Sequence, residues 1–414
     1  MKSPISRWTI GVALIIAIGT VAPVSADWEK GLAAYNAKDF ATAAKEFEDV
    51  TKTNPDYVGG YYMLGLCQRS QNNLSAALGN LRKAVDLDAA NEAPDPRYSI
   101  ALAQALIQAK QYNDAYATLK ALNFSNLPAS YRSSYALLFA QAANKTNRAG
   151  EAVNILNAQV RSDSSNAGLY QALGAAQDNL GDDKAAYAAF KRAYELNPND
   201  ETSGRYAIRA ATTAARRSGS SAEKSKYYTE ASTIAEKLAK AKPNFEHNLL
   251  AGESWLGAQQ YSKALTWFEK AKAQASSNAL VYYYIGQCYT SLGQYGNAQS
   301  SLQQALTQAS GNADLRKKIY NQMGYVHEKN RDFAKAKQAY SEAGNSRQAS
   351  AMDDKIAAQG ENEKFAAECR EFKTKIDALA MQAEEFEKLG DMESARQMRE
   401  QLTVLQRQYA ETCR

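Results

Sequence analysis

The residue types that perform most enzymatic chemistry are sparse in this chain. It has two histidines, His247 and His327, and neither has a second metal-binding side chain four residues further along its predicted helix. The sequence contains no glycine-rich phosphate-binding loop and no motif for a nucleophilic serine. Paired acids such as Glu384 and Glu385 lie among lysines, as on a solvated helix face. We therefore predict a protein that is not an enzyme and that holds no metal or cofactor.

The helices that carry these residues follow a repeating pattern. Residues 279–312 read as two short amphipathic helices joined at Gly293, because apolar residues recur at helical spacing on one face of each. Neither helix can bury its stripe alone, so the unit needs neighbours of its own kind. The stripe consists of Tyr282, Ile285, Gly286 and Tyr289 in the first helix and of Ala298, Leu302 and Ala305 in the second.

The same register recurs along most of the chain. It is clear at residues 24–57, 58–91, 167–200, 245–278 and 317–350, and weaker at 96–129 and 133–166. Neighbouring starts such as 245 and 279 are 34 residues apart. The unit at 201–244 is ten residues longer, and we place its surplus in an exposed loop insertion at Arg216–Lys224, where serine and glycine are frequent. This loop is the predicted joint between two arms.

This pattern resembles that of the tetratricopeptide repeat family, in which the first helix reads W-x2-L-G-x2-Y and the second reads A-x3-F before a proline. Gly174, Ala186, Phe190 and Pro198 match it, whereas tyrosine replaces the family's tryptophan. The resemblance covers about four fifths of the chain. Together with the N-terminal pattern described below, it leads us to expect an exported bacterial member of the family. It implies an all-α fold, with a superhelical solenoid of about nine helix-turn-helix units over residues 27–350.

The repeat pattern ends near residue 351, where a different helical pattern begins. Apolar residues step by four and three from Phe365 to Phe386, as in a coiled-coil seam, and the stepping resumes after Gly390-Asp391. Two helices with so short a break usually fold back on each other. We predict that residues 351–414 form an antiparallel helical hairpin, or coiled coil, whose first helix caps the last repeat.

The four cysteines are of two kinds. Cys67 and Cys288 occupy the same position of the repeat, where a small buried side chain is expected. Cys369 and Cys413 lie at nearly equal distances from the predicted hairpin turn, so the two helices should place them opposite each other. We predict a disulfide between them in an oxidising compartment. Two free thiols, or a bridge from Cys413 to a second chain, are the alternatives.

Residues 1–26 have the features of a cleaved secretory signal peptide. Two basic residues precede a short apolar run, and Val24-Ser25-Ala26 has the small-x-small form that signal peptidase cleaves. We expect a periplasmic or secreted protein that begins at Asp27 and has no transmembrane segment, with a retained N-terminal anchor as the alternative. The segment holds two of the 49 basic residues and none of the 44 acids, so the remainder is nearly balanced at +3. This balance argues against a nucleic-acid partner.

The family resemblance also implies a binding surface, because the first helices of tetratricopeptide arrays line a concave groove that binds peptides or protein segments. The side chains that the register places there are mostly aromatic or uncharged and polar, which suits contacts that combine buried area with hydrogen bonds. They are Tyr35, Tyr62, Arg69, Gln104, Gln141, Asn144, Asp178, Glu253, Tyr283, Gln287 and Tyr325. The set lacks the lysine and asparagine cluster with which some relatives bind a C-terminal carboxylate.

These observations lead to three hypotheses. The first is a non-enzymatic scaffold of the cell envelope that holds a protein or peptide partner in the groove. The second is a module that binds a glycan or another envelope polymer, which would call for aromatic side chains in pairs. The third is an enzyme with its site in the 201–244 unit, although Arg216–Lys224 offers no nucleophile with a base.

Overall fold

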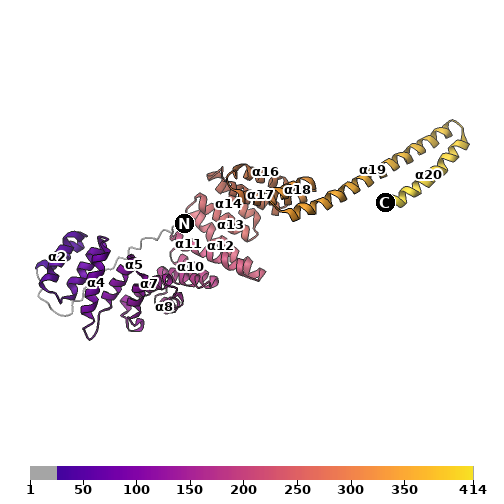
Figure 1. The fold of residues 1–414 in the computed structure, drawn as a ribbon. Helices are drawn as coiled ribbons and strands as arrows, with labels where there is room; N and C mark the ends of the chain where they lie inside the picture. The colour runs from indigo at the N-terminus through magenta and orange to yellow at the C-terminus, as the bar shows by residue number, and fades with distance from the viewer. Residues whose placement is uncertain (1–25, 414) are drawn as a thin grey trace. The chain divides into compact units, whose positions relative to one another are not determined.

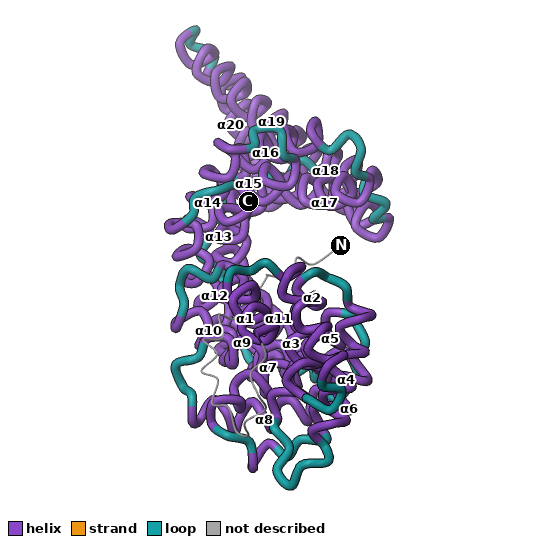
Figure 2. The backbone as a smooth tube through the Cα atoms, turned by 90° about the vertical axis from the view of Figure 1, so that its left-hand side faces the viewer, coloured by secondary structure: helices purple, strands orange, loops and turns teal. Residues whose placement is uncertain are grey.

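The computed structural model describes residues 26–413, over which the chain forms 20 α-helices, one short 3-10 helix and no strand (Figures 1 and 2). The predicted all-α class is therefore confirmed. The signal peptide predicted at residues 1–26 lies outside the described residues, apart from Ala26, with which α1 begins. Within the described part, no helix is both long and apolar enough to cross a membrane.

The chain divides into two compact units, the first ending at Gly219 and the second beginning at Ser220. The first contains α1 (Ala26–Asn36), α2 (Phe40–Thr53), α3 (Val58–Ser70), α4 (Leu74–Asp88), α5 (Pro96–Gln108), α6 (Tyr112–Lys120), η1 (Phe124–Asn126), α7 (Ala129–Lys145), α8 (Ala149–Ser162), α9 (Ala167–Asn179), α10 (Asp183–Leu196) and α11 (Glu201–Arg217). The second contains α12 (Ser221–Ala241), α13 (Phe245–Gly257), α14 (Tyr261–Gln274), α15 (Ala279–Ser291), α16 (Tyr295–Gln308), α17 (Ala313–Lys329), α18 (Phe333–Glu342), α19 (Ser346–Lys388) and α20 (Met392–Thr412).

Within each unit, helices that follow one another in sequence pack side by side as a stack of helical repeats. In sequence order, nine helix pairs from α1/α2 to α17/α18 precede α19 in the described chain, as the repeat count predicts. The sixth pair is divided, since α11 ends the first unit and α12 begins the second.

Small side chains bring the two helices of a pair into close contact. A Cβ atom added to Gly286 on α15 would lie 2.7 Å from Cγ of Leu302 on α16, which is closer than carbon atoms pack. Ala298, on the same side of α16, is fully buried. The same relation links Gly174 to Phe190 in the first unit. The glycine of the repeat is therefore required by the approach of the second helix, and a larger residue would overpack the contact.

The prediction of an exposed loop at Arg216–Lys224 is wrong. α11 continues to Arg217 and α12 begins at Ser221, so only three residues lie between the helices. The hydroxyl of Ser220 accepts a hydrogen bond from the amide of Glu223 at 3.4 Å and caps α12. The serine-rich segment is thus a helix start, with serine and glutamate at the spacing of a capping box. The extra residues lengthen the two helices of this pair to 17 and 21 residues.

The last repeat continues into the C-terminal hairpin without a break. α19 runs from Ser346 to Lys388 as one helix of 43 residues, so the boundary predicted at residue 351 falls inside it. Its first turns pack on α18, where Ala349 and Met352 are buried. α19 therefore caps the last repeat and also forms one side of the hairpin.

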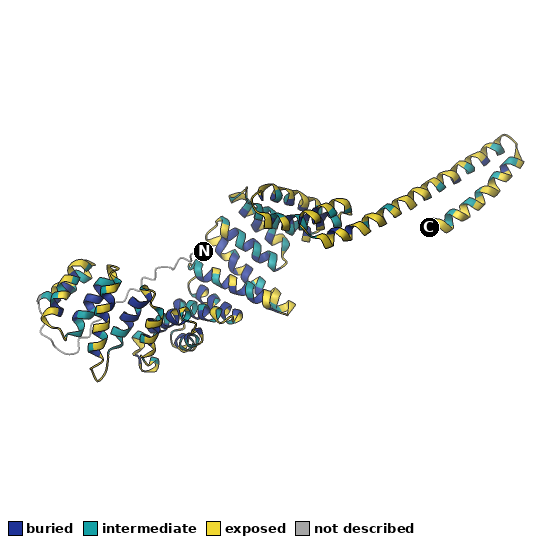
Figure 3. Ribbon diagram, viewed as in Figure 1, coloured by how far each residue is buried: buried dark blue, intermediate teal, exposed yellow. Residues whose placement is uncertain are grey.

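The far half of α19 pairs with α20, which returns beside it (Figure 1). A disulfide joins Cys369 to Cys413, whose Cα atoms lie 5.7 Å apart, at the open end of the hairpin. Ile376 and Ala383 are buried along the seam. Between the two packed ends of α19, residues 357–368 are exposed except for Gly360 at intermediate burial (Figure 3). This stretch is therefore a single helix in solvent.

Candidate protein-binding face

The N-terminal repeats place several predicted binding residues on the neighbouring first helices α1, α3 and α5. The start of α5 is fixed locally, because the Asp95 carboxylate accepts a hydrogen bond from the Arg97 amide at 2.9 Å and Pro96 occupies the first turn. The same carboxylate forms an ion pair with the Arg97 guanidinium at 2.6 Å. Asp95 therefore caps the helix and also neutralises the arginine at its start.

Tyr35, Tyr62, Arg69 and Gln104 lie together on these helices. Nη1 of Arg69 on α3 donates a hydrogen bond to Oε1 of Gln104 on α5 at 2.5 Å. The ring of Tyr62 packs edge-on against that of Tyr98, with centroids 5.1 Å apart. Tyr35 and Tyr62 both interact electrostatically with Arg69. We call Tyr35, Tyr62, Arg69, Tyr98 and Gln104 the Arg69 cluster.

Burial sets the protonation states in the Arg69 cluster. Loss of solvent raises the pKa of Tyr35 above its ordinary value and the pKa values of Tyr62 and Tyr98 to about 12, so these hydroxyls stay protonated at neutral pH. Burial lowers the pKa of Arg69, but a guanidinium remains charged in proteins. Among the described residues, no carboxylate forms an ion pair with Arg69. The cluster is therefore rich in hydrogen-bond donors around one unmatched cation.

A second group of predicted residues meets in the unit that begins at Ser220. On α15, Nε2 of Gln287 donates a hydrogen bond to the Tyr283 hydroxyl at 2.9 Å. Glu253 on α13 accepts a hydrogen bond from Tyr284, whose ring lies 5.7 Å from that of Tyr283. Burial raises the pKa of Glu253 above its ordinary value in spite of this bond. We call Glu253, Tyr283, Tyr284 and Gln287 the Glu253 cluster.

Four predicted residues lie outside both clusters. On α7, Gln141 is exposed and Asn144 is partly buried, and the Asn144 Oδ1 atom has no hydrogen-bond partner in the described chain. Asp178 on α9 forms an ion pair with Arg209 on α11 at 2.7 Å. Tyr325 on α17 is 41% exposed. The predicted set therefore resolves into two local clusters and four positions that do not join them.

Family models identify the repeats directly. One model of the tetratricopeptide repeat matches residues 29–94 and 216–279, and a second matches residues 167–200, 279–312 and 317–343. Together these ranges cover more than half of the chain. The chain belongs to the tetratricopeptide repeat family. Members of this family generally mediate protein–protein interactions and are typically non-enzymatic scaffolds. No curated protein matches the chain as a relative.

Solved tetratricopeptide repeat structures resemble parts of the chain. The C-terminal part of a repeat-containing protein from Cytophaga hutchinsonii is 14% identical, with a TM-score of 0.44 over 59% of this chain and 93% of its own. YrrB, described as having an unusual peptide-binding site, is 17% identical, with a TM-score of 0.35 over 50% of this chain and 97% of its own. A thermophilic protein from Thermus thermophilus is 17% identical, with a TM-score of 0.32 over 45% of this chain and 97% of its own.

Three neighbours of the predicted residues were not found from the sequence: Tyr98, Arg209 and Tyr284. All three lie on the first helix one tetratricopeptide repeat after the residue that they contact. Tyr98 contacts Tyr62, and Arg209 contacts Asp178. Tyr284 reaches back by the same step to Glu253. The sequence does carry a signal for such contacts, namely a complementary side chain roughly one repeat away from each predicted residue. We compared register positions within single repeats only, so this signal was not used.

The residues with the greatest chemical reactivity are buried in the repeats. His247 and His327 are 1% and 7% exposed. Cys67 and Cys288 are buried free thiols, and burial raises the pKa of each to about 12, so neither is a thiolate at neutral pH. In the part of the chain that the structure describes, no three His, Cys, Asp or Glu side chains gather in a way that could hold a metal ion.

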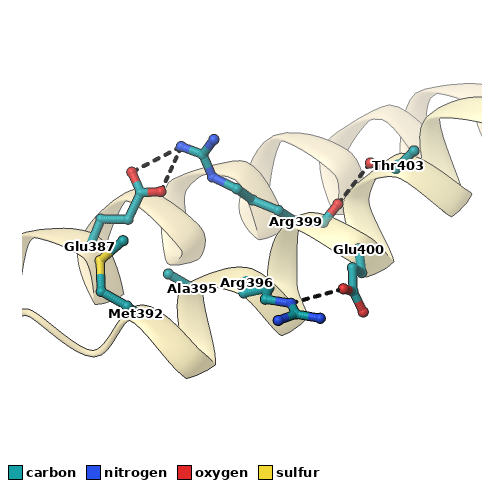
Figure 4. Close-up of a pocket in the computed structure, with 7 residues that line it drawn as sticks. All are labelled: Glu387, Met392, Ala395, Arg396, Arg399, Glu400 and Thr403. Carbon is teal, nitrogen blue, oxygen red and sulfur yellow. Dashed lines mark hydrogen bonds and ion pairs between the residues drawn. The ribbon is translucent and has the colours of Figure 1, made fainter.

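A shallow pocket near the hairpin turn is lined by charges that satisfy one another (Figure 4). Arg399 on α20 forms an ion pair with Glu387 on α19 at 2.7 Å. Arg396 forms a second pair with Glu400 one helical turn later at 3.2 Å. The pocket thus presents paired groups to solvent, whereas the Arg69 cluster presents an unmatched one. We therefore take the Arg69 cluster as the stronger candidate.

Proposed function

We propose that the chain is a non-enzymatic scaffold of the cell envelope whose first helices bind a segment of a protein partner. The observation that carries this proposal is the Arg69 cluster, in which aromatic and polar side chains from α1, α3 and α5 meet. Tyrosine and arginine are the residue types that contribute most to binding at protein interfaces, since they combine large contact area with hydrogen bonds.

The cell-envelope location rests on two features. Residues 1–26 have the pattern of a secretory signal peptide, with small residues at the expected cleavage position. The disulfide between Cys369 and Cys413 suits an oxidising compartment, because thiols in the cytosol are kept reduced. Fractionation of cells that produce the full chain tests this part. Detection of protein with an intact Met1 start in the cytoplasmic fraction would refute the cell-envelope location.

Site-specific photo-cross-linking in living cells tests the binding face. A photoreactive phenylalanine at Tyr62, on α3, should cross-link a protein partner. The same group at Lys83, an exposed residue of the second helix α4, is the matched control and should give no such product. Tyr62→Ala combined with Tyr283→Ala should reduce co-purification of that partner without unfolding the repeats. Equal cross-linking from Tyr62 and Lys83 would refute the assignment of the face.

One observation favours the second candidate, a module that binds a glycan or envelope polymer. That hypothesis calls for paired aromatic rings, and Tyr62 and Tyr98 form such a pair. However, their planes meet at 78°, so the edge of one ring meets the face of the other and the pair offers no flat double platform for a sugar. Sedimentation with purified peptidoglycan distinguishes the candidates. The polymer hypothesis requires co-sedimentation that Tyr62→Ala abolishes.

A further inference from the structure

Arg69 is a partly buried cation that forms no ion pair within the described residues. Its guanidinium donates a hydrogen bond to the neutral Oε1 of Gln104, and its electrostatic neighbours are the neutral phenols Tyr35 and Tyr62. Taking a charge out of water is costly unless an opposite charge or several hydrogen bonds replace the solvent. Five N–H groups are available on a guanidinium, so one bond to an amide oxygen leaves most of this capacity unused.

Two other arginines on first helices of the same unit, Arg97 and Arg209, are matched by acids. Arg97 pairs with Asp95 at 2.6 Å, and Arg209 pairs with Asp178 at 2.7 Å. Each of these pairs supplies a carboxylate from within the repeats. Arg69 differs from both, because Gln104 occupies the position from which a glutamate could have neutralised it. Of these three arginines, Arg69 alone has no carboxylate partner.

The groups around Arg69 favour an acceptor as ligand. The hydroxyls of Tyr35 and Tyr62 stay protonated, and within the described residues neither donates a hydrogen bond to another protein group. The one acceptor in contact with the guanidinium, Gln104 Oε1, is already engaged. A carboxylate could accept from the guanidinium and from the phenols at once, and such charge-assisted bonds are about twice as strong as neutral ones.

We propose that the Arg69 cluster is a subsite for a single acidic side chain, aspartate or glutamate, on the bound segment of the protein partner. Arg69 binds the carboxylate, the hydroxyls of Tyr35 and Tyr62 donate to its free oxygen, and the Tyr62–Tyr98 ring pair packs against the aliphatic part of the side chain. This inference rests on the proposed function, because it assumes that the ligand is a polypeptide. It adds the chemistry by which that polypeptide is recognised.

A double-mutant cycle between protein and peptide tests the subsite. The probe is a randomised peptide library selected on the mature chain from Asp27 with its disulfide intact. We expect selected peptides to share one acidic position. Replacing that residue by its amide, or Arg69 by methionine, should each weaken binding by about tenfold or more, and the double change should weaken it little further. Arg69→Lys should recover part of the affinity, and Arg205→Met on α11, which removes an exposed arginine, should have no effect.

Each outcome bears on a different part of the argument. Selected peptides without an acidic preference, or an amide substitution that weakens wild type and Arg69→Met equally, would overturn the subsite and leave the proposed function standing. Failure to select any peptide would count against the proposed function and remove the subsite with it. Binding of a polyuronate such as alginate that is lost in Arg69→Met, without peptide binding, would assign the same cation to an anionic polymer instead.

The melting temperature separates a binding role of Arg69 from a structural one. Because the cation is partly buried without an acid, Arg69→Met should melt at or above the wild-type temperature. Gln104→Met is the matched change to the other partner of the hydrogen bond, and it should also melt at or above the wild-type temperature. A variant Arg69→Met that melts well below wild type, while still binding the selected peptides normally, would show that Arg69 stabilises the repeat and would overturn the proposal.

Discussion

Cys369 on α19 and Cys413 after the last turn of α20 are joined by a disulfide that closes a loop with a sequence separation of 44 residues. The bridge lies at the open end of the hairpin, while the turn at Gly390 holds the other end. Both ends of the paired helices are therefore fixed, one by chain connectivity and one by the cross-link.

The first prediction concerns this bridge. Cys413→Ser should destabilise the hairpin and leave the repeats unchanged, because the cross-link restricts mainly the unfolded hairpin, by about 4 kcal/mol in the chain-entropy estimate. Hydrogen exchange followed by mass spectrometry should show faster exchange over residues 392–413 and unchanged exchange in α1 to α18. Addition of a reductant should reproduce the effect in wild type and add nothing to the variant. Recovery of a Cys413–Cys413 peptide from native protein would show that the bridge is intermolecular.

The second prediction uses the close approach of α15 and α16. Gly286→Ala should destabilise by about 1–3 kcal/mol, because the new methyl group would overlap Leu302. Leu302→Ala should relieve the overlap, so the double variant should be more stable than the two single losses predict. The control is Gly79→Ala in the middle of α4, where an added Cβ has no atom within 4 Å.

Gly79→Ala should stabilise by about 0.5–1 kcal/mol, because alanine has the higher helix propensity. The shift of the urea unfolding midpoint measures both effects. If Gly286→Ala and Gly79→Ala shifted the midpoint in the same direction, the inference of a tight contact between α15 and α16 would be refuted.

The third prediction is a pH dependence centred on Glu253. Burial raises its pKa in the folded chain above the ordinary 4.5, so folding favours the protonated form. Its contribution to stability is fully present below pH 4.5 and is lost as the pH rises through the raised value. Glu253→Gln removes this loss, so the difference in melting temperature, variant minus wild type, should increase with pH.

Glu236 on α12 is the matched control with the opposite sign. Its hydrogen bond with Lys240 lowers its pKa below the ordinary 4.5, so its contribution is present at neutral pH and is lost as the pH falls. Glu236→Gln should therefore lower the melting temperature most at neutral pH and least in acid. Parallel pH profiles for the two variants would contradict the assigned environments.

The fourth prediction concerns the connection between α11 and α12. Ser220→Ala should destabilise by about 1 kcal/mol, because Ser220 caps the first turn of α12. Ser221→Ala is the adjacent control and should have little effect, since Ser221 is the first residue inside the helix and is exposed. Thermal unfolding measured for both variants decides between a capped helix start and a permissive loop. Equal melting temperatures would favour the loop.

Much of the fold could be predicted from spacing alone. The helix pairs follow from the glycine and alanine positions, since Gly286 and Ala298 mark where two helices touch, and the period is constant. The partners Cys369 and Cys413 follow from their distances to Gly390, because a hairpin pairs residues about its turn. The connection at Ser220 was misread because serine is frequent in loops and at helix starts alike, and only the glutamate three residues later separates the two.

The candidate site was less predictable for a physical reason. Register identifies which face of a helix a residue occupies, and this sufficed for Tyr62 and Arg69. It does not identify which side chain of the next repeat approaches that face, because this depends on the rotation between successive repeats. Tyr98 and the unmatched charge of Arg69 therefore required the structure. Complementary pairs one repeat apart, such as Asp178 with Arg209, are the part of this information that the sequence does carry.

Because α19 is one continuous helix, the orientation of the hairpin about the helix axis is fixed. The helix is about 65 Å long at 1.5 Å per residue. Met352 anchors its start in the last repeat, and Cys369, near the middle of the helix, joins it to the end of α20 through the bridge. Each residue inserted into the exposed stretch between them would turn the hairpin by about 100°, whereas seven would restore nearly the original heading. The number of residues in the stretch 357–368 therefore determines the direction in which the hairpin faces.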